Sequence, residues 1–437
     1  MADFLTREQR LYEWFAPARL GMFYHWGLFT GGGCSSTGPE GNIPLTYDTI
    51  AAFEQAAADP EAIAANMVKL AKDAGAKYVT CTALHSCERF AVLYPTKLQG
   101  FVLRTTKDYV GAFINCSRAE GLVPLLYMPA HAQHSDGAGG PWIADGYREP
   151  AEFVGLLKRL IKELYDLHGE QIGGFWLDGN HPQSVELPDY VHSLLPHAIF
   201  IINNETTVYT PGMDYCTTEF LCNEPDPVYC RPSGLRKVQP TYGVLPPKKD
   251  FNEDIPTCNG WWYGAPGSSL AEIAAGPYAQ DPTYLVREMI SSLGQRGQWN
   301  FSLGIGPLID GSSPEIFRPM LANMGQFMAW AGAAIYDTTG GEGAPLQLGW
   351  TNDGGFFSLT VSLQNPDLLY VLVTTAPSTA LLCIQNTGNR EVAEITDLRS
   401  GQRLPFTNRN RGCIELPDMD WADVARYGAK VLQVTLA

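Results

Sequence analysis

The chain has 437 residues, of which 45% are hydrophobic and 17% are charged. This length exceeds one ordinary hydrophobic core, so we expect a globular protein with two domains. The formal net charge is −16 and no basic run occurs, which argues against nucleic acid and anionic membrane as partners. The ten cysteines include no C-x-x-C pair, as is usual for reduced thiols in a reducing compartment.

The N-terminal residues lack the apolar stretch of a secretory signal, and no apolar run of about 18 residues occurs in the sequence. We therefore expect a cytoplasmic protein with no membrane partner. A secreted protein from which the signal has been trimmed is the alternative.

The first 340 residues alternate strand-like and helix-like segments. After a strand-like run at 20–24, Asp59-Pro60 predicts the start of a helix that stops at Gly75. Strands at 77–84, 122–128, 173–177 and 198–203 then alternate with helices at 108–121, 150–169 and 186–195. Repeated βα units predict parallel strands with right-handed crossovers. Their number favours a (β/α)8-like (TIM-type) barrel over an open sheet.

The alternation is lost at 204–280, where Pro, Gly, Cys and aromatic residues dominate, and long irregular loops on a barrel usually carry function. It returns with a helix at 282–293, a strand at 299–303 and a helix at 314–334. The Gly- and Pro-containing segment 338–345 predicts a linker.

Short β-like runs follow the linker, at 357–363, 369–374, 381–385, 392–397, 413–416 and 430–436. Their spacing predicts an antiparallel β-sandwich. We therefore expect a catalytic barrel at residues 1–340 and a C-terminal antiparallel β-sandwich at residues 341–437.

The segment 173–177 predicts a short buried strand that ends on the carboxylate of Asp178. In a βα barrel, catalytic side chains sit at the C-terminal ends of the strands. Trp176 lies two residues earlier on the same face of the strand, and Gly179 allows a sharp turn. We interpret Asp178 as a catalytic carboxylate, with a loop-capping Asp as the structural alternative.

Other predicted strand ends carry side chains suited to binding a sugar. For each of them, a structural role in the hydrophobic core is the alternative. These residues are His25 with Trp26, His85 and Tyr127. Paired carboxylates carry out glycoside hydrolysis, and a retaining enzyme needs a second, protonated carboxyl group beside its nucleophile.

The irregular segment offers six carboxyl groups for this second role, and spacing alone does not choose among Glu205, Asp214, Glu219, Glu224, Glu253 and Asp254. Glu253 is attractive because Trp261, Trp262 and Tyr263 follow it and suit a sugar-stacking wall.

Other chemistries lack support in the sequence. His131-x-x-His134 has no third ligand nearby, so we expect no metal site. Gly31-Gly32-Gly33 lacks the Gly-Lys-Ser/Thr ending of a phosphate loop, and no G-x-S-x-G elbow occurs. We expect no cofactor.

Four stretches together carry a resemblance to a known family. Residues 14–27 are similar to the motif R-F-G-M-F-I-H-W-G, and residues 75–85 to G-A-K-Y-x-x-L-T-A-K-H-H. Residues 175–179 resemble a strand that ends in a nucleophilic Asp, and residues 304–311 resemble L-N-I-G-P-x-x-D-G. In order and spacing these stretches resemble the α-L-fucosidase family, glycoside hydrolase family 29, over about residues 6–340. Members have a (β/α)8-like barrel and a C-terminal β-sandwich.

The resemblance implies a retaining exo-α-L-fucosidase that releases terminal α-linked L-fucose from oligosaccharides or glycoconjugates by double displacement. It makes Asp178 the nucleophile and Glu253 the general acid/base, with Asp254 or Glu219 as alternatives. The sugar is then bound by His25, Trp26, His85, Tyr127, Trp176, Trp261 and Trp262. Carbohydrate is the expected partner, and the sequence leaves a homo-oligomer open.

Two segments depart from the family pattern. The family's Lys-His-His-Asp-Gly-Phe is replaced by the longer run 84–90, and its Asn-Asp-Arg by Asn203-Asn204-Glu205. We expect a polar contact to the sugar to be lost, or replaced by Glu88 or Arg89. The alternatives are a related glycosidase for another sugar of similar configuration and a carbohydrate-binding protein without catalysis.

Overall fold

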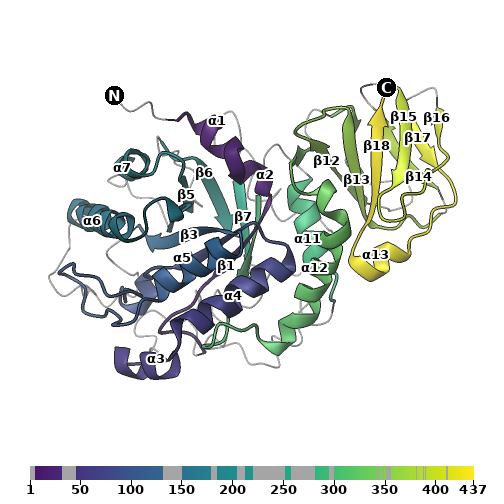
Figure 1. Ribbon diagram of the computed structural model, residues 1–437. Helices are drawn as coiled ribbons and strands as arrows, with labels where there is room; N and C mark the ends of the chain where they lie inside the picture. The colour runs from purple at the N-terminus through teal and green to yellow at the C-terminus, as the bar shows by residue number, and fades with distance from the viewer. Residues whose placement is uncertain are drawn as a thin grey trace.

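The computed structural model shows a closed eight-stranded barrel followed by two antiparallel sheets, which confirms the predicted barrel and β-sandwich (Figure 1). It describes residues 5–31, 46–130, 150–178, 185–203, 212–219, 251–256, 281–294, 300–341, 344–347, 349–350, 356–379, 381–386, 388, 390–409 and 412–437. Within these residues, none of the helices combines the length and apolarity needed to span a membrane.

The barrel strands pair in parallel in chain order, and the last strand pairs with the first. They are β1 (Leu20–Tyr24), β2 (Tyr78–Thr82), β3 (Val123–Pro129), β4 (Gly174–Asp178), β5 (Ile199–Asn203), β6 (Tyr215–Glu219), β7 (Phe251–Pro256) and β8 (Asn300–Ile305). Strands β6 and β7 lie inside the segment 204–280, which the sequence predicted to be irregular. That prediction was wrong for these two stretches, because their polar residues hide the apolar pattern of a buried strand.

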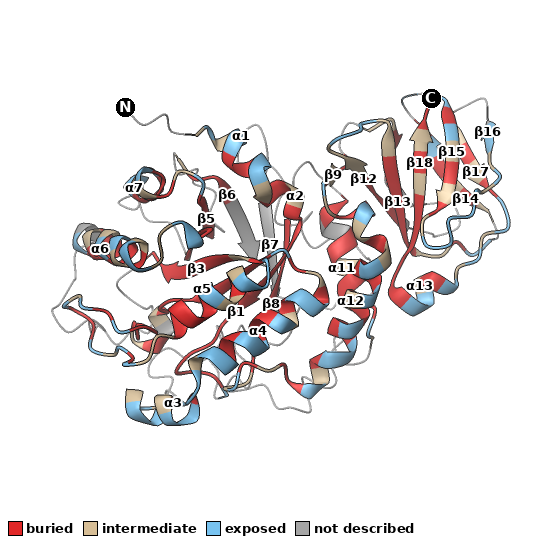
Figure 2. Cartoon of the chain, in the orientation of Figure 1, coloured by how far each residue is buried: buried red, intermediate tan, exposed pale blue. Residues whose placement is uncertain are grey.

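Helices cover the outside of the barrel and turn their apolar faces toward it (Figure 2). They are α3 (Ile50–Ala56), α4 (Pro60–Ala74), α5 (Tyr109–Ala119), α6 (Pro150–His168), α7 (Leu187–Leu194), α11 (Tyr284–Leu293) and α12 (Arg318–Ala331). Helix α4 shows the predicted signals at both ends. Asp59 accepts a hydrogen bond from the Ala62 N–H at 3.0 Å, and Gly75 ends the helix with φ +92°.

A helical segment at the start of the chain closes the end of the barrel where the strands begin. It consists of α1 (Arg7–Arg10), the π-helical turn η1 (Leu11–Phe15) and α2 (Ala16–Ala18). The ring of Phe15 lies 5.1 Å from that of Tyr78 and 4.8 Å from that of Tyr215. Because these tyrosines are the first residues of β2 and β6, the segment fills the N-terminal end of the barrel and leaves the C-terminal mouth for a site.

The carboxylate of Asp214 anchors this N-terminal segment. It is fully buried and accepts hydrogen bonds from Arg10 Nε at 2.9 Å and from the Phe200 N–H at 2.8 Å. His192 Nε2 of α7 lies 2.9 Å from Oδ2, the oxygen that accepts from the Phe200 N–H. A buried charge is tolerated only when it is paired in this way.

The β-sandwich consists of two antiparallel sheets with apolar side chains packed between them. One sheet contains β10 (Leu346–Gln347), β14 (Leu382–Asn386), β17 (Cys413–Leu416) and β16 (Thr407–Arg409) in that order. The other contains β9 (Thr338–Gly340), β11 (Gly349–Trp350), β12 (Phe356–Ser362), β13 (Leu368–Thr375), β18 (Lys430–Leu436) and β15 (Val392–Asp397). Strand β9 pairs with β12, so the first three residues of the expected linker belong to this sheet. The boundary between residues 340 and 341 stays a prediction.

Helices α11 and α12 lie between the barrel and the β-sandwich (Figure 1). Tyr370, Leu372 and Val431 of the second sheet belong to the same buried cluster as the helices of the barrel. The short helix α13 (Ala422–Tyr427) adds Tyr427, whose ring lies 5.7 Å from that of Trp330 on α12. The two parts of the chain therefore share one apolar interface.

The role of Asp214 can be tested by substitution. We expect Asp214→Ala to lower the free energy of unfolding by about 3–5 kcal/mol, because Arg10 then stays buried without its counter-charge. Urea unfolding at neutral pH measures this change. The control is Asp166→Ala, which removes an exposed i,i+4 pair with Lys162 and should change stability little. Equal effects of the two substitutions would contradict this role.

Candidate active site

Asp178 is the last residue of β4 and lies half-buried at the mouth of the barrel. Each of its carboxylate oxygens accepts a hydrogen bond from a neighbouring strand. Tyr127 Oη of β3 donates to Oδ2 at 2.5 Å, and Asn203 Nδ2 of β5 donates to Oδ1 at 2.9 Å. The two donors fix the direction in which the carboxylate points.

Four aromatic or imidazole side chains that the sequence singled out contact one another, and one of them, Tyr127, donates to this carboxylate. His85 stacks on Tyr127 with ring centres 4.9 Å apart, and Tyr127 stacks on Trp176 at 5.2 Å. His25 lies 5.4 Å from His85 and 5.6 Å from Tyr127. The structure thus brings His25, His85, Tyr127, Trp176 and Asp178 together.

The two-residue alternation of the strands produces this grouping. Phe23 and His25 project from β1 to the inside, as Trp176 and Asp178 do from β4, with Phe23 and Trp176 at 5.0 Å. One layer lower, Tyr78 fills the space beside Gly21, where an added Cβ would lie 2.2 Å from the tyrosine ring. The result is a floor of rings beneath the polar groups at the mouth.

Two further residues help to build this group, and the sequence analysis did not single them out. Phe23 forms part of the floor, and its signal was its place on β1, two residues before His25, which follows the strand. Asn203 orients Asp178, and its signal was its place at the end of the next strand.

Burial, with a smaller contribution from the neighbouring His85, lowers the pKa of His25 well below its ordinary value of 6.5. The imidazole is therefore neutral at physiological pH and has one donor and one acceptor nitrogen for hydroxyl groups. Trp176 is only 2% exposed, and its Nε1 donor has no hydrogen-bond partner in the part of the chain that the structure describes. Both rings suit a polar ligand with an apolar face.

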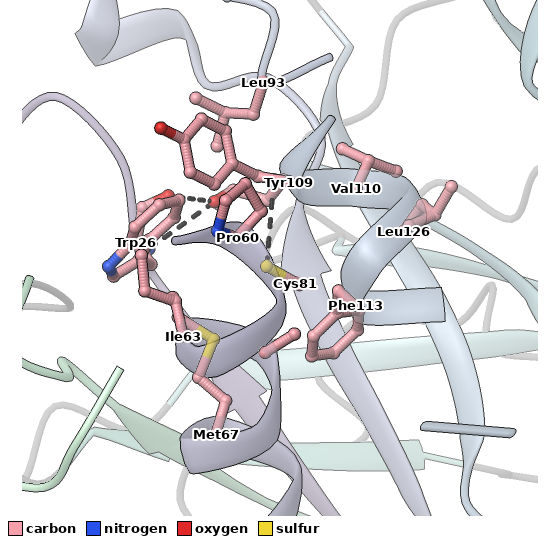
Figure 3. Close-up of a pocket in the computed structure, with 12 residues that line it drawn as sticks. Trp26, Pro60, Ile63, Met67, Cys81, Leu93, Tyr109, Val110, Phe113 and Leu126 are labelled. Atoms are coloured by element: carbon pink, nitrogen blue, oxygen red, sulfur yellow. Dashed lines mark hydrogen bonds between the residues drawn. The ribbon is translucent and has the colours of Figure 1, made fainter. Parts of the chain in front are cut away.

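Trp26 does not join this group. Its ring packs 5.2 Å from Phe53 and 5.1 Å from Tyr109, and its Nε1 donates to the Ile309 carbonyl at 3.2 Å. It lines an apolar pocket between β2, β3 and the helices α4 and α5 (Figure 3). None of the described residues that line this pocket carries a carboxylate, and we interpret it as a gap in the core rather than a sugar site.

The altered loop after β2 uses its carboxylate inside the protein. Glu88 is fully buried and accepts a hydrogen bond from the Phe29 N–H at 2.9 Å. Its Oε1 lies 2.4 Å from where a Cβ at Gly27 would stand, so a larger residue at that position would displace the carboxylate. Arg89 and Phe90 adopt φ values of +54° and +55°. Glu88 therefore ties the loop that carries His85 to the one that follows His25.

The strand register distinguishes the carboxyl residues proposed for the acid/base. Asp254 pairs with Glu219 on β6 and with Ser302 on β8. Followed from strand to strand, these pairings put positions 219 and 254 on the same side of the barrel sheet as Asp178. Glu253 pairs with Phe301, a residue of the core outside the barrel.

The remaining candidates divide into two groups. Asp214 is excluded, because it holds Arg10 at the opposite end of the barrel. Glu205, Glu224, Trp261 and Trp262 lie outside the described residues.

A parallel barrel with an oriented carboxylate above a floor of aromatic rings at its C-terminal mouth has the architecture of a glycoside hydrolase. The model of the family described as Alpha-L-fucosidase matches residues 4–228, just over half of the chain. The chain belongs to the α-L-fucosidase family, which confirms the resemblance seen in the sequence, and it is a glycoside hydrolase. No curated protein matches it.

Solved structures of α-L-fucosidases share the fold over nearly the whole chain. Isoenzyme 1 from Paenibacillus thiaminolyticus is 20% identical with a TM-score of 0.69, covering 99% of each chain. An enzyme from Bacteroides thetaiotaomicron is 17% identical with a TM-score of 0.71, covering 100% of this chain and 97% of the other. The Thermotoga maritima enzyme in complex with fucose is 19% identical with a TM-score of 0.70, covering 97% and 96%. At these identities the likeness establishes the fold.

The lowered pKa of His25 predicts a pH effect on stability. Below pH 6.5 the unfolded chain protonates this residue and the folded chain does not. The free energy of unfolding therefore decreases as the pH is lowered. The slope from this one group is about 1.4 kcal/mol per pH unit. We expect His25→Gln to lose less stability than wild type between pH 6.5 and 5.5 in urea unfolding.

The matched control is His197→Gln, which changes a largely exposed histidine paired with Glu13. It should follow the wild-type pH dependence. The prediction fails if His25→Gln and wild type lose equal stability over this range.

Proposed function

We propose that the protein is a retaining exo-α-L-fucosidase that hydrolyses terminal α-linked L-fucose by double displacement, with Asp178 as the nucleophile. The observation that carries this proposal is the carboxylate of Asp178, held at the end of β4 by Tyr127 and Asn203 above the ring floor. A nucleophile needs a fixed direction of approach, and two hydrogen bonds from adjacent strands supply it.

The proposed reaction has two steps. In the first, Asp178 attacks the anomeric carbon, the bond to the leaving oxygen breaks, and the acid/base residue protonates that oxygen. In the second, the same residue takes a proton from water, which attacks the anomeric carbon and releases Asp178. Two inversions give net retention, and the two carboxyl groups should lie about 5–5.5 Å apart.

The side chains around Asp178 suit a sugar with one apolar face. The rings of Trp176 and Tyr127 offer a surface for the carbon-bound hydrogens and the methyl group of fucose. His25, His85 and Trp176 Nε1 offer hydrogen bonds to its hydroxyl groups. Because the ring floor closes the barrel beneath them, the site favours the terminal unit of a chain, which supports exo action.

Relatives of the same fold support this arrangement. The Bacteroides thetaiotaomicron enzyme forms a trapped covalent intermediate with 2-fluoro-fucosyl fluoride, and the Thermotoga maritima enzyme binds fucose. A covalent intermediate is the hallmark of a retaining mechanism.

For the acid/base, the three strand carboxyls Glu219, Glu253 and Asp254 remain in the proposal. The register supports Asp254 and Glu219 over Glu253, because only those two belong to the set of positions that includes Asp178. The aromatic residues Trp261 and Trp262 remain proposed contacts for the leaving group.

The nucleophile is tested with p-nitrophenyl α-L-fucoside beside a panel of other nitrophenyl sugars. We expect Asp178→Asn to lower turnover by about three orders of magnitude or more, because no covalent intermediate forms. Azide should restore turnover in Asp178→Gly and give the β-fucosyl azide. The control, Asp189→Asn on the exposed side of α7, should keep full activity.

Three outcomes would revise this assignment. Full turnover in Asp178→Asn would remove it as the nucleophile. Turnover of another sugar alone would replace fucose as the substrate. Sugar binding without turnover of any substrate would indicate a binding protein.

The acid/base is tested with Asp254→Asn, Glu219→Gln and Glu253→Gln. Loss of the acid should slow substrates with poor leaving groups far more than activated aryl fucosides, since only the poor ones need protonation. We expect this pattern in Asp254→Asn or Glu219→Gln and not in Glu253→Gln. The pattern in Glu253→Gln alone would contradict the register argument.

A further inference from the structure

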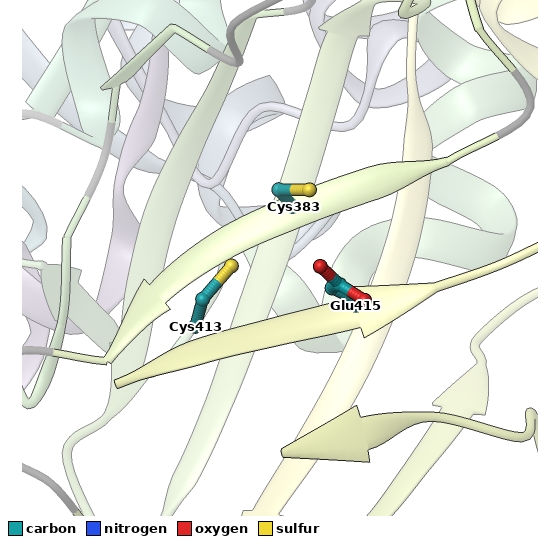
Figure 4. A group of neighbouring side chains, drawn as sticks. All are labelled: Cys383, Cys413 and Glu415. Carbon is teal, nitrogen blue, oxygen red and sulfur yellow. The ribbon is translucent and has the colours of Figure 1, made fainter. Parts of the chain in front are cut away.

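Two cysteines and a glutamate lie side by side on the four-stranded sheet of the β-sandwich (Figure 4). Cys383 lies on β14, and Cys413 and Glu415 lie on the neighbouring strand β17. The strands pair antiparallel, with Cys383 opposite Glu415. The two sulfurs and a carboxylate oxygen all lie within 4.8 Å of one another.

Core packing does not explain this placement. Ile384 and Ile414, the alternate residues of the two strands, are fully buried between the sheets. Cys383 and Cys413 therefore belong to the opposite face, where both are partly exposed. Cysteines outside disulfides are among the most buried residues in proteins, so two on an outward sheet face point to another role.

A disulfide does not explain the pair either. Cys413 pairs with Gln385, so the two cysteines occupy diagonal positions of the ladder. Diagonal neighbours have Cα atoms about 7–8 Å apart, whereas a disulfide usually needs about 4.4–6.8 Å. The structure has no disulfide between them.

We propose that Cys383, Cys413 and Glu415 form a binding site for a thiophilic divalent cation, with Zn²⁺ as its ion. Zinc binds sulfur at about 2.3 Å and carboxylate oxygen at about 2.0–2.2 Å, so tetrahedral ligand atoms lie roughly 3.5–3.8 Å apart. Side-chain rotations that bring these ligand atoms about 1 Å closer together reach this spacing. The site is separate from the barrel mouth and goes beyond glycoside hydrolysis.

The chemistry of the three groups suits such an ion. On binding, the two thiols release their protons to water and coordinate as thiolates, and the carboxylate supplies a third negative ligand. Because this face is partly exposed, water can complete the fourth position. Strand β17 pairs with β14 on one side and with β16 on the other at Cys413 and Glu415, so the ligands lie on a sheet rather than on a loop.

The test uses the reduced, metal-stripped full chain. Equilibrium dialysis with Zn²⁺ followed by elemental analysis measures stoichiometry, and Cd²⁺ titration detects the sulfur-to-metal absorption band. We expect wild type to bind one more equivalent of Zn²⁺ than the double variant Cys383→Ser/Cys413→Ser. Zinc should also raise the Tm of wild type more than that of the double variant.

Cys116→Ser is the matched control, because it removes a partly exposed thiol of α5 far from the sheet. It should bind zinc as wild type does. All variants should keep wild-type turnover of substrate, since none touches the barrel mouth, and this also verifies folding. Failure of the proposed fucosidase reaction would leave the zinc measurements unaffected.

Glu415→Gln provides a second, milder test. It keeps the shape of the side chain and removes the anionic ligand, so we expect zinc affinity to weaken by about tenfold or more. Equal zinc uptake by wild type and the double variant would overturn the proposal. Unchanged affinity in Glu415→Gln would remove the carboxylate from the site. Oxidation of the two cysteines to a disulfide, without zinc uptake by the reduced protein, would contradict the metal site and indicate a redox-active cysteine pair instead.

Discussion

The pairing of β8 with β1 closes the barrel and thereby decides which side chains meet inside it. In a closed barrel every second residue of each strand faces the same small interior. At the end where the strands begin, Phe15, Tyr78 and Tyr215 fill that interior. The ion pair of Arg10 and Asp214 holds the N-terminal helical segment there. Among the described residues, the polar groups around Asp178 then lie at the mouth, above a floor of packed rings. The position of the site therefore follows from closure.

The orientation of Asp178 depends on its two neighbours in the sheet. Tyr127 and Asn203 belong to the strands on either side, and the register places Asn203 directly beside Asp178. The distance between donors and carboxylate is thus fixed by backbone hydrogen bonds rather than by flexible loops. The segment in which the sequence departs from the family's Asn-Asp-Arg still begins with the asparagine that performs this task.

Local signals account for what the sequence predicted well. Asp59, Pro60 and Gly75 mark the ends of α4 by capping and turn chemistry, which act within a few residues. Long-range pairing accounts for what it missed. The residues of β6 and β7 are polar, so only their place between β5 and β8 identifies them as strands. Trp26 follows His25 in sequence, but alternation sends its ring to the outer core.

The loop after β2 places its carboxylate inside the protein rather than at the mouth. Glu88 is fully buried, and its carboxylate accepts a hydrogen bond from the Phe29 N–H. Among the described residues around Asp178, His25 and the indole of Trp176 are neutral groups that can donate a hydrogen bond. A pocket of rings discriminates weakly against an added hydroxyl, whereas a buried donor left without its hydroxyl strongly disfavours the wrong sugar. Neutral hydrogen-bonding groups of this kind would therefore contribute to selectivity for the proposed substrate.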